Sequence, residues 1–569
     1  MRLVILYGSQ TGTAQDVAEH IWRESKRYGF TGPVMPMDEY PIEEIGEERL
    51  MVLVAATTGN GDEPDNMKKT WKVLLRKNLS SNSLQFLHFA CLGLGDSSYA
   101  KFNFTAKKLH KRLLQLGAHG LIPIGLCDDQ HDHGLQAVAL PWMQQLWMDL
   151  QRRFHDAVRE VELYKTPSKW DVELLKQPVQ LVSEETLKWP FHEECQRFVL
   201  KINERTTSTN HFQDVRLLKF TVPDELGWQP GDVLHVRPCN SNKQVAVFFA
   251  LVQEHGLSFN ADTAVQLSSA FDDMPLPLAY IKPVTVGLLA KYVWDFSAMP
   301  RQRAFELLAL NCDDDLEKEK LLEFTTAEGL DDLIQYINRP RRNILEVLQD
   351  FRHATSKLSL HQLFEVFTII QPRSFSIASM NSPEVGSTLD LLVAVVDYKT
   401  KLSTPRLGLC SNWLKCLDPG NIVLGVIRSG TMTLPRETAT PLIMVGPGTG
   451  MAPFRSIIQH KYSQREAGQI IGELVVYFGC RNKEKDFHFR DDFEQWQATL
   501  LTQNFIAFSR DQEKKLYVQH LIKENAKLLR HLIKNKEAVI LVAGTSKNMP
   551  KEVKDAFTFV YILNNASEA

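Results

Sequence analysis

The chain has 569 residues, of which 44% are hydrophobic and 23% charged, and its formal net charge is −3. A chain of this length exceeds what one hydrophobic core accommodates, so we expect about three or four domains, and the near-zero charge gives no reason to expect nucleic-acid binding. The 8 cysteines form no CxxC pair, which argues against a zinc site or a disulfide framework and favours reduced thiols.

Nothing in the sequence indicates a membrane or export segment. No apolar run approaches the roughly 18–20 residues that a membrane span requires. Residues 1–7 lead directly into a strand-like pattern and a glycine-rich loop, which leaves no room for a signal peptide. We therefore expect a soluble cytoplasmic monomer that binds neither a metal nor a membrane.

Residues 1–155 alternate short apolar runs with helical patterns. Strands are predicted at residues 2–7, 50–56, 85–92 and 120–124, and helices at 14–28, 65–77, 104–116 and 140–155. This alternation is typical of a doubly wound parallel sheet, whose ligands bind beyond the carboxyl ends of the strands. The glycine-rich loops 8–14, 56–63 and 93–98 each follow a strand, so we expect them to converge on one edge of the sheet.

The first of these loops, GSQTGTA, suits a phosphate group. Hydroxyls of Ser9, Thr11 and Thr13 stand before a helix, and the backbone N–H groups at a helix N-terminus favour an anion. The loop carries no lysine and is not an ATP-type P-loop; alone, it also fits an ordinary polar turn. The loops TTGNGD (57–62) and GLGDSSY (93–99) add flexible backbone and the ring of Tyr99, which suit a flat ring system.

The motifs GSQTGTAQ, ATTGNGDEPDN and LGLGDSSYAKFN resemble the flavodoxin-like domain of the diflavin reductase family. The resemblance implies an FMN whose phosphate lies at residues 9–14, whose ring edge meets residues 56–59, and whose ring stacks on Tyr99. Thr58 stands where P450 reductases carry a second stacking tyrosine, so aromatic cover on one face only is implied. The FMN-binding residues implied are Ser9, Gln10, Thr11, Gly12, Thr13, Ala14, Ala56, Thr57, Thr58, Gly59, Leu94, Gly95, Asp96, Ser97, Ser98, Tyr99, Ala100, Lys101, Phe102, Asn103 and Asp129.

The pattern changes after residue 155. Residues 156–198 carry Pro167, Pro178 and Pro190 and predict a linker. A second domain is predicted over 199–435, with strands at 215–222, 233–236, 374–378, 389–397 and 421–428, and with a helical insert over 243–350 that contains helices at 300–310, 315–324 and 343–351. Strands and helices alternate again over 436–569, with strands at 442–445, 473–479 and 538–544.

Two motifs of the second domain, RSFS (373–376) and GLCS (408–411), suit a second nucleotide. Arg373 is able to hold a pyrophosphate, and GLCS is a glycine turn that opens a helix; by itself RSFS also fits an ordinary edge strand. Together they resemble the FAD domain of the ferredoxin–NADP reductase superfamily, which implies a β-barrel. The resemblance places Ser376 beside flavin N5 as the catalytic residue, and leaves Arg339 and Arg342 as solvated surface. The FAD-binding residues implied are Arg341, Arg373, Ser374, Phe375, Ser376, Gly408, Leu409, Cys410 and Ser411.

The loop GPGTG (446–450) departs from the GxGxxG dinucleotide pattern, so the choice of a third nucleotide rests on FSRD (508–511) and KLYVQ (515–519). An adenosine 2′-phosphate needs cations and hydroxyls, whereas a free 2′-hydroxyl needs an acidic acceptor. These segments alone also fit a solvated charged loop. In the family they indicate NADPH, and Cys480 is a packed residue. The residues implied are Thr449, Ser509, Arg510, Lys515, Leu516, Tyr517, Val518, Gln519 and Glu552.

The resemblance covers nearly the whole chain and implies an NADPH-dependent oxidoreductase. A hydride passes from NADPH to FAD, and single electrons pass through FMN to a protein acceptor. The motifs RSFSIAS, NRPRRNILEVL and AGTSKNM are most similar to the family branch that serves cytosolic iron–sulfur cluster assembly, whose acceptor is the iron–sulfur protein anamorsin.

The last residues depart from the family pattern. Family members continue to a terminal aromatic residue that covers the FAD ring, with an acidic residue nearby, whereas this sequence stops after residues 557–569 without either. The alternative expectation is therefore a tail-truncated form that is poorly active, or a non-catalytic scaffold that binds the acceptor.

Overall fold

The computed structural model describes residues 1–59, 61–99, 101–154, 168–176, 180–184, 186–187, 195–223, 225–271, 274–381, 388–499, 501–544 and 548–562. The chain forms two compact units, each built from separate stretches of sequence. Unit 1 contains Met1–Pro190, Asn240–Gln371 and Thr400–Thr404, and unit 2 contains Phe191–Cys239, Pro372–Lys399 and Pro405–Ala569. We describe each unit by itself.

Unit 1 begins with an α/β domain around a parallel sheet in the order β2-β1-β3-β4-β5, with β6 also paired to β4. Its elements are β1 (Val4–Gly8), α1 (Thr13–Arg27), β2 (Val34–Pro36), β3 (Leu50–Ala56), α2 (Lys68–Leu74), β4 (His88–Gly95), α3 (Phe104–Gln115), β5 (His119–Gly120), β6 (Gly125–Asp128) and α4 (Gln136–Arg153). Every residue of β1 is buried, as expected for a strand covered on both faces. The predicted doubly wound sheet is confirmed.

One strand prediction in this domain is wrong. Residues 121–124 lie between β5 and β6, and both of these strands pair with β4. Pro123 has no N–H to give to a strand ladder, so the pairing with β4 is interrupted there and resumes at Gly125. The helix predicted at 65–77 is also shorter, because Asp65–Met67 forms a 3₁₀ turn before α2.

The helical insert, Asn240–Gln371, is the second long stretch of unit 1. Its elements are α5 (Asn242–Glu254), β11 (Ala264–Ser269), β12 (Val284–Thr285), α6 (Val286–Tyr292), α7 (Gln302–Leu310), α8 (Asp315–Glu323), α9 (Leu330–Leu333), α10 (Ile344–Asp350), α11 (Arg352–Ser356) and α12 (Leu360–Val366). Capping boxes with Gln or Glu at the third helical position begin α5, α10 and α12. Buried aromatic side chains form the core of the insert: Phe248, Trp294, Phe296, Phe364 and Phe367.

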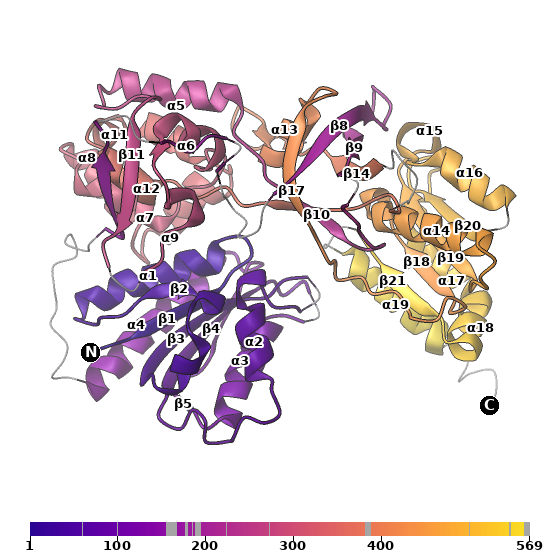
Figure 1. Cartoon of the computed structure of the whole chain (residues 1–569), viewed down its shortest axis with the longest axis horizontal. Helices are drawn as coiled ribbons and strands as arrows, with labels where there is room; N and C mark the ends of the chain where they lie inside the picture. Colours follow the sequence, from indigo (N-terminus) through magenta and orange to yellow (C-terminus); the bar gives the residue numbers. More distant parts are fainter. Residues whose placement is uncertain are drawn as a thin grey trace. The chain divides into compact units, whose positions relative to one another are not determined.

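The segment predicted as a linker contains a strand. Strand β7 (Trp170–Leu174) pairs antiparallel with β11, and β12 completes this three-stranded sheet. The partner of β7 is distant in the sequence, and a run of five residues does not by itself indicate a partner at that distance. Figure 1 shows the insert beside α1 of the N-terminal α/β domain.

Unit 2 contains an antiparallel sheet in the order β13-β10-β17-β8-β9-β14. Its strands are β8 (Gln196–Arg205), β9 (Val215–Thr221), β10 (Val233–Val236), β13 (Arg373–Ser376), β14 (Thr388–Ala394) and β17 (Ile422–Arg428). In the described part of the chain, the edge strands β13 and β14 meet only at an isolated bridge between Ile377 and Leu391. The predicted β-barrel is therefore not closed, because β13 ends before a continuous ladder with β14 begins.

The C-terminal domain of unit 2 has a parallel sheet in the order β20-β19-β18-β21. Its elements are β18 (Leu442–Val445), α14 (Met451–Glu466), β19 (Leu474–Cys480), α15 (Lys483–Asp486), α16 (Arg490–Ala498), β20 (Thr502–Phe508), α17 (Val518–Glu524), α18 (Ala526–Lys536), β21 (Val539–Val542) and α19 (Met549–Ile562). Separate hydrophobic clusters, one with α14 and α16 and one with α17 to α19, pack on this sheet (Figure 1).

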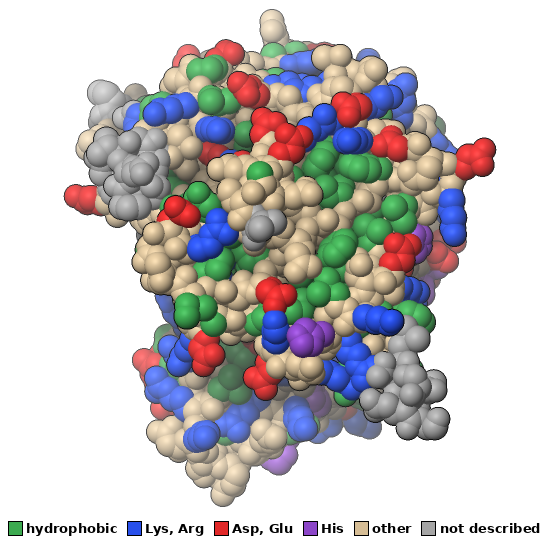
Figure 2. All heavy atoms as spheres, turned by 90° about the vertical axis from the view of Figure 1, so that its right-hand side faces the viewer, with side chains coloured by type: hydrophobic (Ala, Val, Ile, Leu, Met, Phe, Trp, Pro, Cys, Tyr) green, Lys and Arg blue, Asp and Glu red, His purple; other side chains and the backbone are tan. Residues whose placement is uncertain are grey.

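Two surface properties complete the description. Among the described residues, no helix combines the length and the apolar character needed to cross a bilayer. Acidic and basic side chains are interspersed over the face displayed in Figure 2, in keeping with a formal net charge of −3.

Candidate cofactor sites

The structure brings the glycine-rich loops of the N-terminal domain together. They follow β1, β3 and β4, which are adjacent and parallel, so their carboxyl ends lie at one edge of the sheet. Hydrogen bonds tie these loops to each other: Thr57 N–H donates to the Leu94 carbonyl at 3.0 Å, and Asp129 N–H donates to the Gly95 carbonyl at 2.9 Å. The edge is thus one continuous surface.

Two kinds of hydrogen bond hold the phosphate loop: one within the loop, and others to residues that precede α2. Gly12 adopts φ 90°, a conformation that favours glycine, and its N–H donates to Ser9 Oγ at 3.1 Å. The N–H of Ser9 donates to Asn66 Oδ1 at 2.8 Å. The side chain of Gln10 is turned away from the loop, because its amide nitrogen donates to Asp65 Oδ2 at 3.0 Å. Asn66 and Asp65 are therefore supporting residues that sequence reasoning missed.

Hydrogen bonds join the two ends of the second loop. Both the N–H and the hydroxyl of Thr58 donate to the Asp62 carbonyl, at 2.9 and 3.1 Å. Tyr99, on the next loop, is 38% exposed and so presents ring surface for stacking. Ala56, Thr57 and Gly59 lie beside Thr58 at the end of β3. Ala100 lies outside the described residues.

The acidic residue that organises the third loop is Asp128, the neighbour of the predicted flavin-side residue Asp129. The Asp128 carboxylate accepts hydrogen bonds from the N–H groups of Ser97 at 2.9 Å and Gln130 at 3.0 Å. Burial alone would raise the pKa of Asp128, but these hydrogen bonds hold it below its ordinary value. Asp129 is exposed at the same edge. The feature that could have pointed to Asp128 is its position at the end of strand β6.

The residues at the end of the third loop are held in place by contacts with α3 and β6. Asn103 is fully buried at the N-cap of α3, with φ 53°, and its side-chain amide donates to the Cys127 carbonyl at 2.9 Å. Lys101 and Phe102 turn toward α3, where the Lys101 ammonium lies 5.7 Å from the Phe104 ring and the Lys107 ammonium 5.2 Å from the Phe102 ring. Asp96 and Ser98 are linked by a hydrogen bond from the Ser98 N–H at 2.8 Å.

The second group of predicted residues lies in unit 2. Strand β13 pairs with β10, with Ser376 opposite Val233. Arg373 and Ser374 are exposed, Ser376 is half-buried, and Phe375 packs partly against the hydrophobic core of the antiparallel sheet. Arg341 belongs instead to unit 1, where it has φ 54° and its guanidinium donates to Met299 Sδ at 3.9 Å.

The loop GLCS opens α13 (Leu409–Lys415) with Gly408 as its N-cap. A Cβ at Gly408 would lie 2.7 Å from Val396 Cβ, so only glycine fits the close approach. Ser411 Oγ accepts a hydrogen bond from Val396 N–H at 3.0 Å, and burial raises the pKa of Cys410 to about 12. The side chains of Cys410 and Ser411 are thus inert supports, and backbone N–H groups are what this turn offers to a diphosphate.

The third group surrounds the ends of β18, β19 and β20. Ser509 is buried and its N–H donates to the Cys480 carbonyl at 2.9 Å; Arg510 N–H donates to the Arg481 carbonyl at 2.8 Å. These bonds fix the backbone at Arg510, and the side chains of Arg510 and Lys515 are both exposed. Burial raises the pKa of Cys480, which keeps this thiol protonated and supports its packing role.

The remaining residues of this group are also placed by local contacts. Tyr517 is the N-cap of α17, is 39% exposed, and lies 5.8 Å from the His520 ring. The Gln519 amide donates to the Glu552 carboxylate at 2.5 Å, which joins α17 to α19. Leu516 is partly buried and Val518 is buried in the cluster beneath. Thr449 lies in the 3₁₀ turn Gly448–Gly450.

Two of the predicted loops share one feature that fits a phosphate. Gly12 and Gly408 are the N-caps of α1 and α13, and neither helix has a side-chain cap, so their first-turn N–H groups are available for an anion, which the helix dipole also favours. Helix α14 offers fewer donors, because Met451 N–H donates to the carbonyls of Gly448 and Thr449 and Pro453 has no N–H.

Comparison with known proteins agrees with this arrangement. Residues 5–142 match the family described as flavodoxin, residues 190–413 the FAD binding domain, and residues 444–555 the oxidoreductase NAD-binding domain. The chain is 43% identical to NADPH-dependent diflavin oxidoreductase 1 of Danio rerio, with 98% of this chain and 94% of the relative covered. It is 42% identical to the Xenopus laevis protein of that name (100% and 96% covered) and 35% identical to the Schizosaccharomyces pombe protein (97% and 93%).

Proposed function

Since this chain belongs to the NADPH-dependent diflavin oxidoreductases, we propose that its electron acceptor is the iron–sulfur protein anamorsin, in cytosolic iron–sulfur cluster assembly. The chain is an oxidoreductase that binds FMN, FAD and NADPH, and electrons pass from NADPH through FAD to FMN. The acceptor, the cytoplasmic location and a monomeric state are the parts that we propose.

The observation that supports a protein acceptor is the exposure of the FMN edge. Tyr99 is 38% exposed, and Asp129 and Gln130 are exposed beside it. An exposed edge of this kind lets a second protein approach the flavin, whereas a small substrate would call for an enclosed pocket. The motifs RSFSIAS and NRPRRNILEVL support the choice of anamorsin, because they resemble the branch of the family that serves iron–sulfur assembly.

The test is anaerobic mixing of the NADPH-reduced full chain with oxidised anamorsin. We expect the cluster absorbance of anamorsin to bleach, and ferricyanide and cytochrome c to be reduced in parallel assays. Reduction of these artificial acceptors without any reduction of anamorsin contradicts the proposal. Binding of anamorsin without bleaching of the flavins by NADPH identifies a non-catalytic scaffold instead.

We also propose that Ser376 stands beside flavin N5. Its hydroxyl is half-buried at the end of β13, on an edge strand that has only one paired neighbour, β10, in the described ladders. We expect Ser376→Ala to slow reduction of FAD by NADPH about 10- to 100-fold, with FAD content unchanged, since a hydrogen bond present in the transition state is lost.

Single-turnover stopped-flow measurement of flavin bleaching checks this prediction, with FAD content measured after release. Thr209→Ala is the control, because it removes an exposed hydroxyl of the same unit from a residue outside the predicted FAD site. We expect it to leave the rate of hydride transfer unchanged. An unaffected rate in Ser376→Ala excludes the role.

A further inference from the structure

The phosphate loop of the FMN site contains no cationic side chain, yet a guanidinium from the insert lies next to it. A Cβ placed on Gly12 would be 2.8 Å from Nη2 of Arg301 and 4.0 Å from Nε2 of Gln371. Arg301 precedes α7 as its N-cap, in the same compact unit as the loop. Glycine at position 12 thus permits both the turn and the approach of Arg301.

The guanidinium of Arg301 is partly exposed and keeps N–H donors with which it can bind another anion. Its Nη1 lies 3.4 Å from Oδ1 of Asp16, in the first turn of α1, and each of these side chains is 27% exposed. An arginine has five N–H donors, and the one ion pair that Arg301 makes among the described residues, at this length, engages only a part of them. Asp16 also places a negative charge beside the loop, where it would repel a phosphate dianion unless a cation offsets it.

The packing of α1 against the insert determines where Arg301 lies. Lys169, which directly precedes β7 in the sheet that β7 forms with β11 of the insert, pairs with Glu19 at 2.7 Å. The rings of Trp22 of α1 and Phe271 of the insert meet edge to face at 5.1 Å. Complementary charges on the two surfaces favour a single register of the insert along α1.

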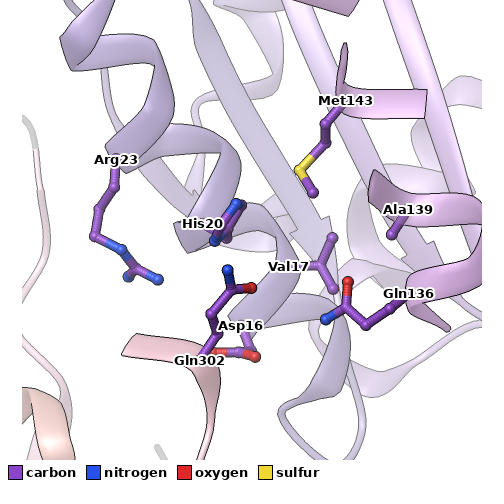
Figure 3. A pocket seen from close by; sticks show the side chains of 8 residues that line it. All are labelled: Asp16, Val17, His20, Arg23, Gln136, Ala139, Met143 and Gln302. Atoms are coloured by element: carbon purple, nitrogen blue, oxygen red, sulfur yellow. The ribbon is translucent and has the colours of Figure 1, made fainter. Parts of the chain in front are cut away.

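A small polar pocket lies at this joint, next to Arg301. Figure 3 shows the side chain of Gln302 of α7 pointing toward His20 of α1, with Asp16 beside it, and residues of α4 on the opposite side of the pocket: Gln136, Ala139 and Met143. Gln302 follows Arg301 directly, so the wall of the pocket and the guanidinium beside Gly12 belong to one turn of the insert. The contacts between α1 and the insert therefore bring Arg301 of the insert next to the phosphate loop.

We propose that Arg301 is a phosphate-binding residue of the FMN site, supplied by the helical insert. The backbone N–H groups of α1 bind the phosphate from the helix end, and Arg301 supplies the positive charge that the loop lacks. Arg301 thereby distinguishes FMN from riboflavin. Because binding linkage is reciprocal, FMN also stabilises the packing of the insert on α1.

The test is titration of the full-length protein, depleted of FMN, with FMN and with riboflavin, followed by quenching of flavin fluorescence. In Arg301→Gln we expect the Kd for FMN to rise about 10- to 100-fold and the Kd for riboflavin to change less than about 2-fold, because charge-assisted hydrogen bonds to the phosphate are lost. The control is Arg352→Gln, on an insert arginine whose side chain is 71% exposed; we expect neither Kd to change.

Two results overturn the proposal: an equal rise of both Kd values, which reveals a packing role, or no change in either. Asp16→Asn gives an independent measurement, because it removes the partner of Arg301 but not the phosphate ligand. We expect FMN binding to be retained or strengthened; weakening equal to that of Arg301→Gln shows that Arg301 serves only the ion pair. If Arg301→Gln does not fold, Arg301→Met, which keeps the apolar stem, takes its place with the same two readings.

Discussion

Arg455→Met is expected to lower the free energy of unfolding of unit 2 by about 3–5 kcal/mol, the usual result of leaving a buried charge without its partner. Arg455, on α14, is only 9% exposed. Its Nη1 donates to the Ala378 carbonyl at 2.8 Å and to Asp390 Oδ2 at 3.0 Å. These bonds join the C-terminal domain to the antiparallel sheet.

The substitution leaves Asp390 buried, with 3% exposure, and Lys219 at 4.0 Å as its nearest cation in the described ion pairs. Arg455 Nε also donates to Asp492 Oδ2 at 2.5 Å, so a second carboxylate loses its partner. The Arg455–Asp390 pair contributes more than a surface ion pair because both residues are buried, where water and counterions screen charges much less.

Urea unfolding followed by circular dichroism, together with release of FAD, measures the effect. Arg465→Met is the matched control: it lies on the same helix and its guanidinium donates to the exposed Thr499 carbonyl at 3.1 Å. We expect the control to change stability by less than about 0.5 kcal/mol. Adding Asp390→Asn to Arg455→Met recovers part of the loss, whereas equal stability of the two arginine variants contradicts the prediction.

The second large effect concerns the choice between NADPH and NADH. We expect the double variant Arg510→Ala with Lys515→Ala to raise the KM for NADPH about 100-fold while the KM for NADH is unchanged, because only NADPH carries the 2′-phosphate. Both cations are exposed, and Arg510 is positioned by its own N–H bond to the Arg481 carbonyl at 2.8 Å.

Steady-state reduction of ferricyanide with each nucleotide checks this expectation. Lys514→Ala is the control, since it removes a neighbouring exposed lysine and keeps the predicted pair. A parallel rise of both KM values shows instead that the substitutions distort the loop between β20 and α17. The same measurement in wild type sets the ratio against which the variants are compared.

Predictions from local pattern succeeded where one segment carries its own signal. Strands β3, β10 and β18 begin and end where predicted, because each is a short apolar run between turn residues. Strand β20 was not predicted, since Thr502, Gln503 and Asn504 mask its alternation, yet β19 pairs with all of it. Strand β7 was assigned to a linker for a different reason: its partner β11 is distant in the sequence.

The amino-acid sequence by itself determined the order of the domains and the three cofactors, because glycine turns before helices and the motifs around them are local in the chain. Only the tertiary structure decided which side chains support those turns. Asp128 braces the loop of Ser97, and Arg301 reaches Gly12 from a distant part of the sequence. Such contacts depend on how helices and sheets pack, and packing joins residues whose separation along the chain leaves no periodic signal.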